Sequence, residues 1–278
     1  MAAPSPMSES GVRAAVVAAA RENALDYYLS ALLAPRAYRE DLIVLAAFQG
    51  ELARIPHLAS EPMAAEIRLQ WWRDWIGAMS ANARCGNPLA DALADVAMRH
   101  DLVRTELLAS VDARSQLEPD DATDPIFAYR QLQLAKDCAA MRRSARVMGV
   151  LPAAAGGEAA HQDQLFLETC GLAVTFAQMA LGERQRLAHS GSDTKFREQL
   201  GNLIASARLN LQLAESHVSA RPRLLRIAAL PVALVEPYLR ACEKADADTA
   251  ADRASADPPM LPLTRTWRLW RAARLGRL

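Results

Sequence analysis

The chain has 278 residues, of which 51% are hydrophobic, and this length and composition fit one large helical domain. Its 32 Lys and Arg residues balance its 32 Asp and Glu residues, so it lacks the cationic excess of a dedicated nucleic-acid-binding protein. The four cysteines form no Cys-x-x-Cys pair, which argues against disulfide scaffolds and zinc sites and favours a reducing compartment.

Hydrophobic residues recur at helical spacing along nearly the whole chain, and we therefore predict an all-α fold. In chain order, the predicted helices span residues 38–55, 61–79, 89–100, 102–111, 127–150, 165–187, 196–218 and 224–242. Pro56 is expected to end the first of these helices, and Pro231 and Pro237 to bend the last one. The helix 165–187 is apolar almost all round, so we expect it in the core.

The domain organisation follows from the composition. Residues 1–242 are predicted to form one helical domain, 243–262 an Asp/Ala/Pro-rich linker, and 263–278 a basic C-terminal helix. No apolar run approaches the roughly 18 residues of a membrane span, and the first residues lack a signal-peptide pattern. We therefore expect a soluble, cytoplasmic protein.

One string of residues is specific: Arg68 to Asp74 (RLQWWRD), on the predicted helix 61–79. Less specific strings are Glu51 to Ile55 (ELARI) before it and Gly171 to Ala173 (GLA), a weaker match, after it. These strings resemble the squalene/phytoene synthase family, and within it the branch of respiratory complex I assembly factors and their bacterial relatives. The resemblance implies an isoprenoid-synthase-type helical bundle around a central cavity.

Active members of that family hold Mg²⁺ through two pairs of carboxylates, each spaced i, i+4 on one helix face. Aligned by eye on Phe48, the first pair would fall at Ala53 and His57. Aligned on Gly171, the second pair would fall at Gly182 and Arg186. None of these four residues is a carboxylate. We therefore expect no bound metal, no cofactor and no metal-dependent reaction, with the fold retained.

Other residues at metal-ligand spacing have plainer interpretations. Asp91 and Asp95 are i, i+4 on a predicted helix, where such charged pairs are common on exposed faces. Asp120 and Asp124 lie between prolines, so ordinary turn chemistry is expected there. His57 is interpreted as a polar residue just after a helix end, and the histidines show no zinc-site spacing.

The arginine-rich string on the helix 61–79 has two interpretations. In the resemblance this helix flanks the cavity, so Arg68 and Arg73, together with Arg39, are candidates to bind an anionic ligand such as a lipid phosphate. In the other interpretation the tryptophans of the string pack in the core. Its arginines then pair with Glu66 and Asp74.

The C-terminal segment combines arginines with tryptophans. The residues concerned are Arg265, Trp267, Arg268, Trp270, Arg271 and Arg274. A helix places Leu263, both tryptophans and Ala273 on one face and the arginines around the other sides, which suits an anionic membrane surface or an acidic partner. Alternatively, the tryptophans cap the bundle, and Leu261 and Leu263 dock there as well.

Two functions from different classes remain open. By resemblance, the chain would be a non-catalytic binding or assembly factor in respiratory complex I biogenesis, with complex I subunits or assembly proteins as partners and an isoprenoid or lipid as a ligand. It would then work at the periphery of the inner membrane in a bacterium, or in the mitochondrial matrix in a eukaryote. The alternative is a Mg²⁺-dependent prenyltransferase that condenses two isoprenoid diphosphates head to head. A lipid-binding module without an assembly role is a third, weaker hypothesis.

Overall fold

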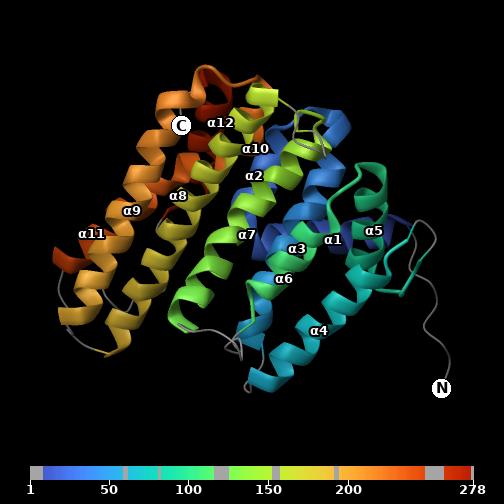
Figure 1. Ribbon diagram of the computed structural model, residues 1–278, viewed down its shortest axis with the longest axis horizontal. Coiled ribbons are helices and arrows are strands. Elements are labelled where there is room, and N and C mark those ends of the chain that lie inside the picture. The colour runs from blue at the N-terminus through green and yellow to red at the C-terminus, as the bar shows by residue number, and fades with distance from the viewer. Residues whose placement is uncertain are drawn as a thin grey trace. The chain divides into compact units, whose positions relative to one another are not determined.

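The all-α prediction is confirmed by a computed structural model, in which every regular element of the described residues is helical (Figure 1). The residues that the structure describes are 9–58, 62–80, 83–115, 125–151, 157–190, 194–247 and 260–276. The chain divides into two compact units, which are described separately. Unit 1 comprises residues 1–133 and 146–149, and unit 2 comprises residues 134–145 and 150–278.

Unit 1 is organised around a long central helix, α3. Its elements are α1 (Glu9–Asn23), α2 (Leu25–Leu33), the 3-10 helix η1 (Arg36–Tyr38), α3 (Arg39–Leu58), α4 (Pro62–Ala78), α5 (Pro88–Arg99) and α6 (Arg104–Asp112). Helix α3 contacts α1, α2, α4 and α5. Its side chains Phe48, Leu52 and Ile55 are fully buried, so it forms the core of this unit.

Unit 2 is organised around α8, the longest helix that the structure describes. The elements are α7 (Pro125–Val147, which also gives residues to unit 1), α8 (Gly157–Ser190), α9 (Thr194–Val218), α10 (Arg223–Ala228), η2 (Leu230–Leu234), α11 (Val235–Ala247) and α12 (Pro262–Leu275). Helix α8 packs along α9 and also contacts α11 and η2. The core position predicted for residues 165–187 is thus confirmed for the part whose side chains are described.

One helix of the described chain, α8, is long and apolar enough to cross a membrane. Its segment Gly157–Arg184 contains a window with a mean hydropathy of 1.4, and half of that window is buried in the folded chain. The expectation that no segment reaches this length is therefore wrong by composition alone. Core helices pass the same test, and the contacts of α8 with its neighbours are those of a core helix.

Three prolines affect the helices differently from what the sequence predicted. Pro56 does not end α3, which continues to Leu58, because a proline in the last turn removes only one hydrogen-bond donor. Pro231 does more than bend its helix: the chain leaves the α conformation at Ala229, passes through η2 and resumes as α11. Pro237 lies in the first turn of α11, where a proline is tolerated.

The remaining boundary differences concern the predicted connections. Helix α8 begins at Gly157, well before residue 165. Helix α11 runs to Ala247, so residues 243–247 are helical rather than part of the linker. The single-domain organisation and the central cavity stay predictions.

Candidate functional site

The first expected pair of metal ligands falls on α3. Ala53 is half-buried there and offers no oxygen ligand, and the side chain of His57 lies outside the described residues. The neighbouring carboxylate, Glu51, accepts a hydrogen bond from Arg54 Nε at 2.5 Å. The carboxylate of Glu51 is therefore paired with the guanidinium of Arg54.

The second expected pair falls on α8. Gly182 is half-buried, and a Cβ added to it would meet nothing within 4 Å. The side chain of Arg186 is outside the described part. Among the residues with described side chains, no group of three or more His, Cys, Asp or Glu could hold a metal ion. Ala53 and Gly182 carry no side-chain oxygen, the kind of ligand that Mg²⁺ prefers. Loss of the metal site stays a prediction.

The carboxylates Asp91 and Asp95 on α5 bind a loop of their own unit. The Asp91 carboxylate accepts hydrogen bonds from the backbone amides of Cys85 at 2.8 Å and Gly86 at 3.2 Å. Asp95 forms an ion pair with Arg84 at 2.8 Å. Both side chains thus fix the turn that precedes α5, which is a more specific role than an exposed face. Asp120 and Asp124 lie outside the described residues.

The tryptophans of α4 pack within unit 1. Trp72 is buried and meets the Phe48 ring edge-to-face, with ring centroids 5.2 Å apart. Trp75 is half-buried and donates its indole N–H to the carbonyl of Ala90 at 3.2 Å. Trp71 lies edge-to-face against Trp72 at 5.1 Å and is more exposed. These contacts support the core-packing interpretation of the string.

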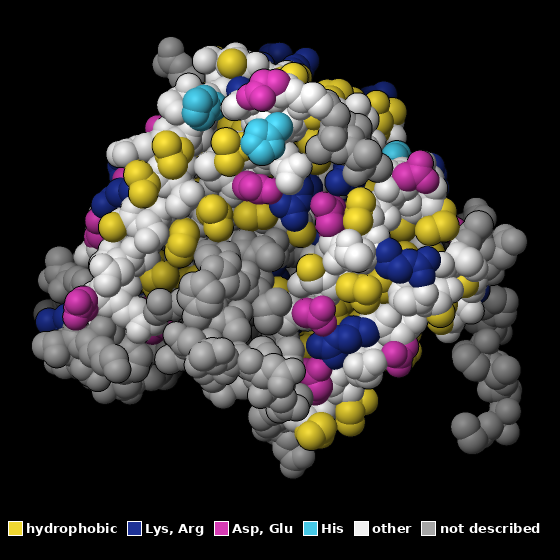
Figure 2. All heavy atoms as spheres, in the orientation of Figure 1, with side chains coloured by type: hydrophobic (Ala, Val, Ile, Leu, Met, Phe, Trp, Pro, Cys, Tyr) yellow, Lys and Arg dark blue, Asp and Glu magenta, His cyan; other side chains and the backbone are white. Residues whose placement is uncertain are grey.

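Arg73 binds two carboxylates from different helices. Its Nε donates to Asp112 on α6 at 2.7 Å, and its Nη1 donates to Glu66 on α4 at 2.6 Å. Burial would lower the pKa of Arg73, but the bonds to Asp112 and Glu66 outweigh it and raise the pKa. The expected partner Asp74 is instead bonded to Gln70. Over α4 and α6, Figure 2 shows basic side chains flanked by acidic ones.

The other two arginine candidates have different environments. Arg39 begins α3, and its Nε donates to the carbonyl of Ala34 at 2.8 Å, just after the end of α2. Arg68 is exposed, and its Nε lies 3.7 Å from the carboxylate of Glu51. The geometry thus gives Arg39 and Arg73 structural partners and leaves the guanidinium of Arg68 as the most accessible of the three. Ligand binding by any of them stays a prediction.

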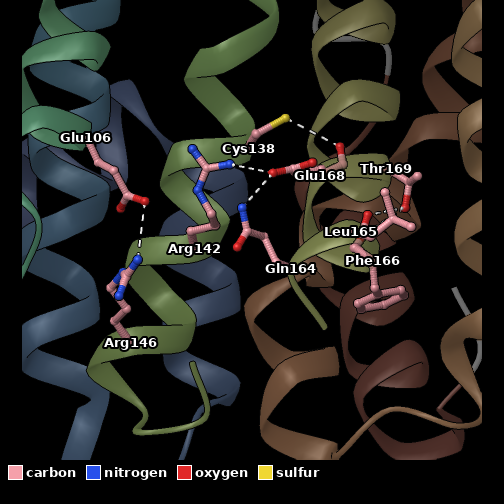
Figure 3. Close-up of polar contacts among 9 residues, drawn as sticks. All are labelled: Glu106, Cys138, Arg142, Arg146, Gln164, Leu165, Phe166, Glu168 and Thr169. Atoms are coloured by element: carbon pink, nitrogen blue, oxygen red, sulfur yellow. Dashed lines mark hydrogen bonds and ion pairs between the residues drawn. The ribbon is translucent and has the colours of Figure 1, made fainter. Parts of the chain in front are cut away.

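A polar layer between α7 and α8 was not predicted from the sequence. Figure 3 shows Arg142 of α7 and Gln164 of α8 both directed at the carboxylate of Glu168, at 3.2 and 3.1 Å. Deeper in unit 2, Thr175 donates to Asp137 at 2.8 Å, with both side chains fully buried. Asp137 and Arg142 of α7 thus find their partners on α8 within this unit.

The side chains of helix α12 are arranged differently from both interpretations of its sequence, the membrane or partner surface and the cap on the bundle. Arg265 is buried, and its guanidinium lies over the Tyr238 ring at 5.8 Å. Leu269 and Ala272 share this buried face, whereas Trp267 and Trp270 are directed to solvent. The capping interpretation is therefore wrong, because both tryptophans lie on the outer side. The separation of tryptophans from arginines is also wrong, because Arg271 and Arg274 stack on the two indoles.

Unit 1 also contains a pocket of about 350 Å³ between α1, α3 and α5. Its walls are apolar, with Val16, Ile43 and Val96 among them, and its rim is charged. Asp41 at this rim binds Arg99 at 2.5 Å and His100 at 2.7 Å. The rim charges are thus largely neutralised within the chain.

The fold and these residues define the class of protein. Residues 20–163 match the squalene/phytoene synthase family, and because the match covers just over half of the chain, the chain belongs to this family. Among solved structures, squalene synthase HpnC from Alicyclobacillus acidocaldarius is similar, with a TM-score of 0.50 and 15% identity over 96% of this chain and 94% of that chain. This likeness confirms the helical fold.

Relatives with a named role are complex I assembly factors. The protein named "NADH dehydrogenase (ubiquinone) complex I, assembly factor 6" of Bos taurus is 24% identical over 295 residues, covering 98% of this chain and 86% of that protein. Its Rattus norvegicus counterpart is 25% identical over 265 residues, covering 90% and 80%. The Homo sapiens counterpart is 23% identical over 275 residues. The expected resemblance to this branch is thereby confirmed.

Proposed function

We propose that the chain is a non-catalytic member of the squalene/phytoene synthase family that acts as a binding or assembly factor in respiratory complex I biogenesis. The observation that carries the proposal is the end-to-end similarity to complex I assembly factor 6, which spans 98% of this chain. Family membership alone would equally favour a synthase. The similarity to proteins named complex I assembly factor 6 is what favours the assembly role over a synthase.

The chemistry of the ligand positions supports the non-catalytic part of the proposal. A head-to-head condensation ionises an allylic diphosphate, and the departing charge needs Mg²⁺ held by carboxylates. At the positions aligned with those carboxylates, Ala53 and Gly182 carry no oxygen. Arg186 would bring a positive charge to where a cation belongs. Asp91 and Asp95, which have the right spacing, are bonded to a loop instead.

The assembly role is tested by deleting the gene in its source organism. We expect loss of NADH:ubiquinone oxidoreductase activity and of the assembled complex on native gels, with both restored by the wild-type gene. Tagged protein should also co-purify subunits or assembly proteins of that complex. Unchanged complex I after deletion would refute the assembly role.

The catalytic alternative has its own test, and membership of a synthase family is what favours it. Purified protein is mixed with farnesyl or geranylgeranyl diphosphate and Mg²⁺, with and without NADPH, and diphosphate release and hydrocarbon products are measured. We expect no release above a heat-inactivated control. Mg²⁺-dependent turnover would refute the pseudoenzyme. Asp91, Asp95 and Glu183, the buried carboxylate next to Gly182 on α8, would then be changed to Ala one at a time.

A further inference from the structure

Among the described residues, helix α12 contacts unit 2 through one face. Arg265, Leu269 and Ala272 are buried on that face, and the helix packs against η2. Arg265 lies over Tyr238 of α11. Because these contacts fix the rotation of the helix, they also determine which side chains face outward.

The outward face combines large apolar side chains with a cation. At 3.6 residues per turn, Leu263, Trp267, Trp270 and Arg274 fall within an arc of about 60° on the side opposite the buried face. Leu263 is 85% exposed, Trp267 52% and Trp270 47%. Leu261, just before the helix, is exposed as well. Exposed Trp and Leu side chains side by side on one helix are unusual for a surface that meets only water.

Two guanidinium groups lie directly over the exposed indoles. Arg271 is 4.9 Å from the centre of the Trp267 ring, and Arg274 is 5.6 Å from that of Trp270. Helix α12 contains no Asp or Glu. Arg268 and Arg271 also line a pocket of about 150 Å³ together with Glu215 and Glu236. Arg274, in the middle of the outward arc, adds positive charge to the tryptophan surface itself.

We propose that this outward face of α12, formed by Leu263, Trp267, Trp270, Arg271 and Arg274, binds an anionic membrane surface. Indole rings suit the headgroup region, since their apolar body enters the acyl boundary while the N–H stays hydrated. Arginines beside them can bind lipid phosphates. An acidic protein would complement the positive charge of the arginines. The row of exposed apolar side chains on a single helix, however, favours a lipid interface. The inference does not depend on the proposed function.

The test uses the full chain and vesicle co-sedimentation at about 0.1 M salt. Vesicles contain phosphatidylcholine alone, or with about one third phosphatidylglycerol. We expect binding to the anionic vesicles that weakens as salt is added. The double variant Trp267→Ser with Trp270→Ser should bind roughly tenfold more weakly. Arg271→Gln with Arg274→Gln should lose about fivefold per arginine and most of the salt dependence.

Matched controls distinguish binding by this surface from nonspecific adsorption of the protein to vesicles. Leu209→Ser with Leu213→Ser removes two exposed leucines of α9, and Arg36→Gln with Arg197→Gln removes two exposed charges elsewhere; both should bind as the wild type does. The tryptophan variant should melt near the wild-type temperature, because its changed side chains are half-exposed. Absence of wild-type binding to anionic vesicles, or equal losses in the controls, would overturn the proposal. So would a tryptophan variant that loses an acidic protein partner while keeping vesicle binding.

Discussion

Gly171 of α8 lies directly against the backbone of Cys138 of α7. A Cβ at position 171 would stand 2.4 Å from the amide nitrogen of Cys138 and 2.5 Å from its Cα, closer than real Cβ atoms approach. Gly171 therefore permits the close approach of the two helices. At the same crossing, the Cys138 thiol donates to the carbonyl of Glu168 at 3.4 Å, and burial raises its pKa to about 12, so it stays protonated at neutral pH.

Replacing Gly171 with alanine should destabilise the protein. Because the neighbouring atoms are backbone, the helices must separate, and we expect a loss of about 1–3 kcal/mol in the free energy of unfolding. The matched control is Gly182→Ala on the same helix, where the new Cβ meets nothing within 4 Å. That variant should gain about 0.5–1 kcal/mol from helix propensity. Urea unfolding measures both, and equal stability of the two variants would contradict the packing argument.

The buried hydrogen bond between Thr175 and Asp137 gives a second prediction. Thr175→Val keeps the shape but deprives the fully buried Asp137 of one donor, so we expect a cost of about 1–3 kcal/mol in unfolding free energy. Thr169→Val on α8 is the control, because that hydroxyl bonds only to carbonyls of its own helix. It should change stability by under about 0.5 kcal/mol. A harmless Thr175→Val would mean that Asp137 is satisfied without it.

Arg73 should be more important for stability than Arg68. Arg73→Gln leaves Glu66 and Asp112 without their shared cation, and we expect a loss of about 1–3 kcal/mol. Arg73→Lys should recover only part of this, because an ammonium group lacks the fork that reaches both carboxylates. Arg68→Gln should cost under about 0.5 kcal/mol, since that side chain is exposed and 3.7 Å from Glu51. Thermal and urea unfolding of the three variants would rank them, and a reversed order would refute the assignment.

Arg208 of α9 forms ion pairs with Glu236 and Glu243 of α11. This cluster should make the stability of the fold depend on pH. Burial would raise the pKa of Glu236, but hydrogen bonds from Arg208 and Arg240 outweigh it and lower the pKa. Hydrogen bonds from Arg208 also lower the pKa of Glu243. A carboxyl group with a lowered folded-state pKa stabilises the fold above its unfolded value, near about 4.3, and loses that contribution as the pH falls through the folded value.

Arg208→Gln should therefore reduce stability at pH 7 and matter progressively less as the pH drops below about 4. Urea unfolding of the wild type and the variant across this range measures the difference. Arg197→Gln, an exposed change on the same helix, should show a small effect that does not vary with pH. If the loss of unfolding free energy in Arg208→Gln stayed constant down to acidic pH, it would come from lost packing and not from the ion pairs.

The helical fold could be predicted because apolar spacing is a local property of the chain. The buried residues Phe48, Leu52 and Ile55 repeat at intervals of three and four, which already places them on one face of α3. Helix ends were harder to predict. Pro56 lies in the last turn of α3, and the helix continues past it to Leu58. Pro231 lies in the middle of the predicted helix 224–242, and there the 3-10 helix η2 interrupts the α conformation. Helices α1 and α2 were missed, although the alanine and valine spacing of α1 was a usable signal.

The candidate site was only partly predictable. The pairing of Glu51 with Arg54 follows from their separation on one helix, and the structure has it. The pairing of Arg73 with Glu66 on the same helix was expected in the same way, but its second partner could not be found, because Asp112 comes from α6, far along the chain. The layer of Arg142, Gln164 and Glu168 was missed for the same reason.

The sequence by itself determined that this protein is helical and that it resembles the squalene/phytoene synthase family; the alignment of Ala53 and Gly182 with the metal-ligand positions stays a prediction. These properties depend on residue identity and local spacing. Only the tertiary structure decided which side of α12 faces outward. The period of a helix shows which residues share a face, but not which face a neighbour covers; here Tyr238 and η2 take the face of Arg265, and the tryptophans remain outside.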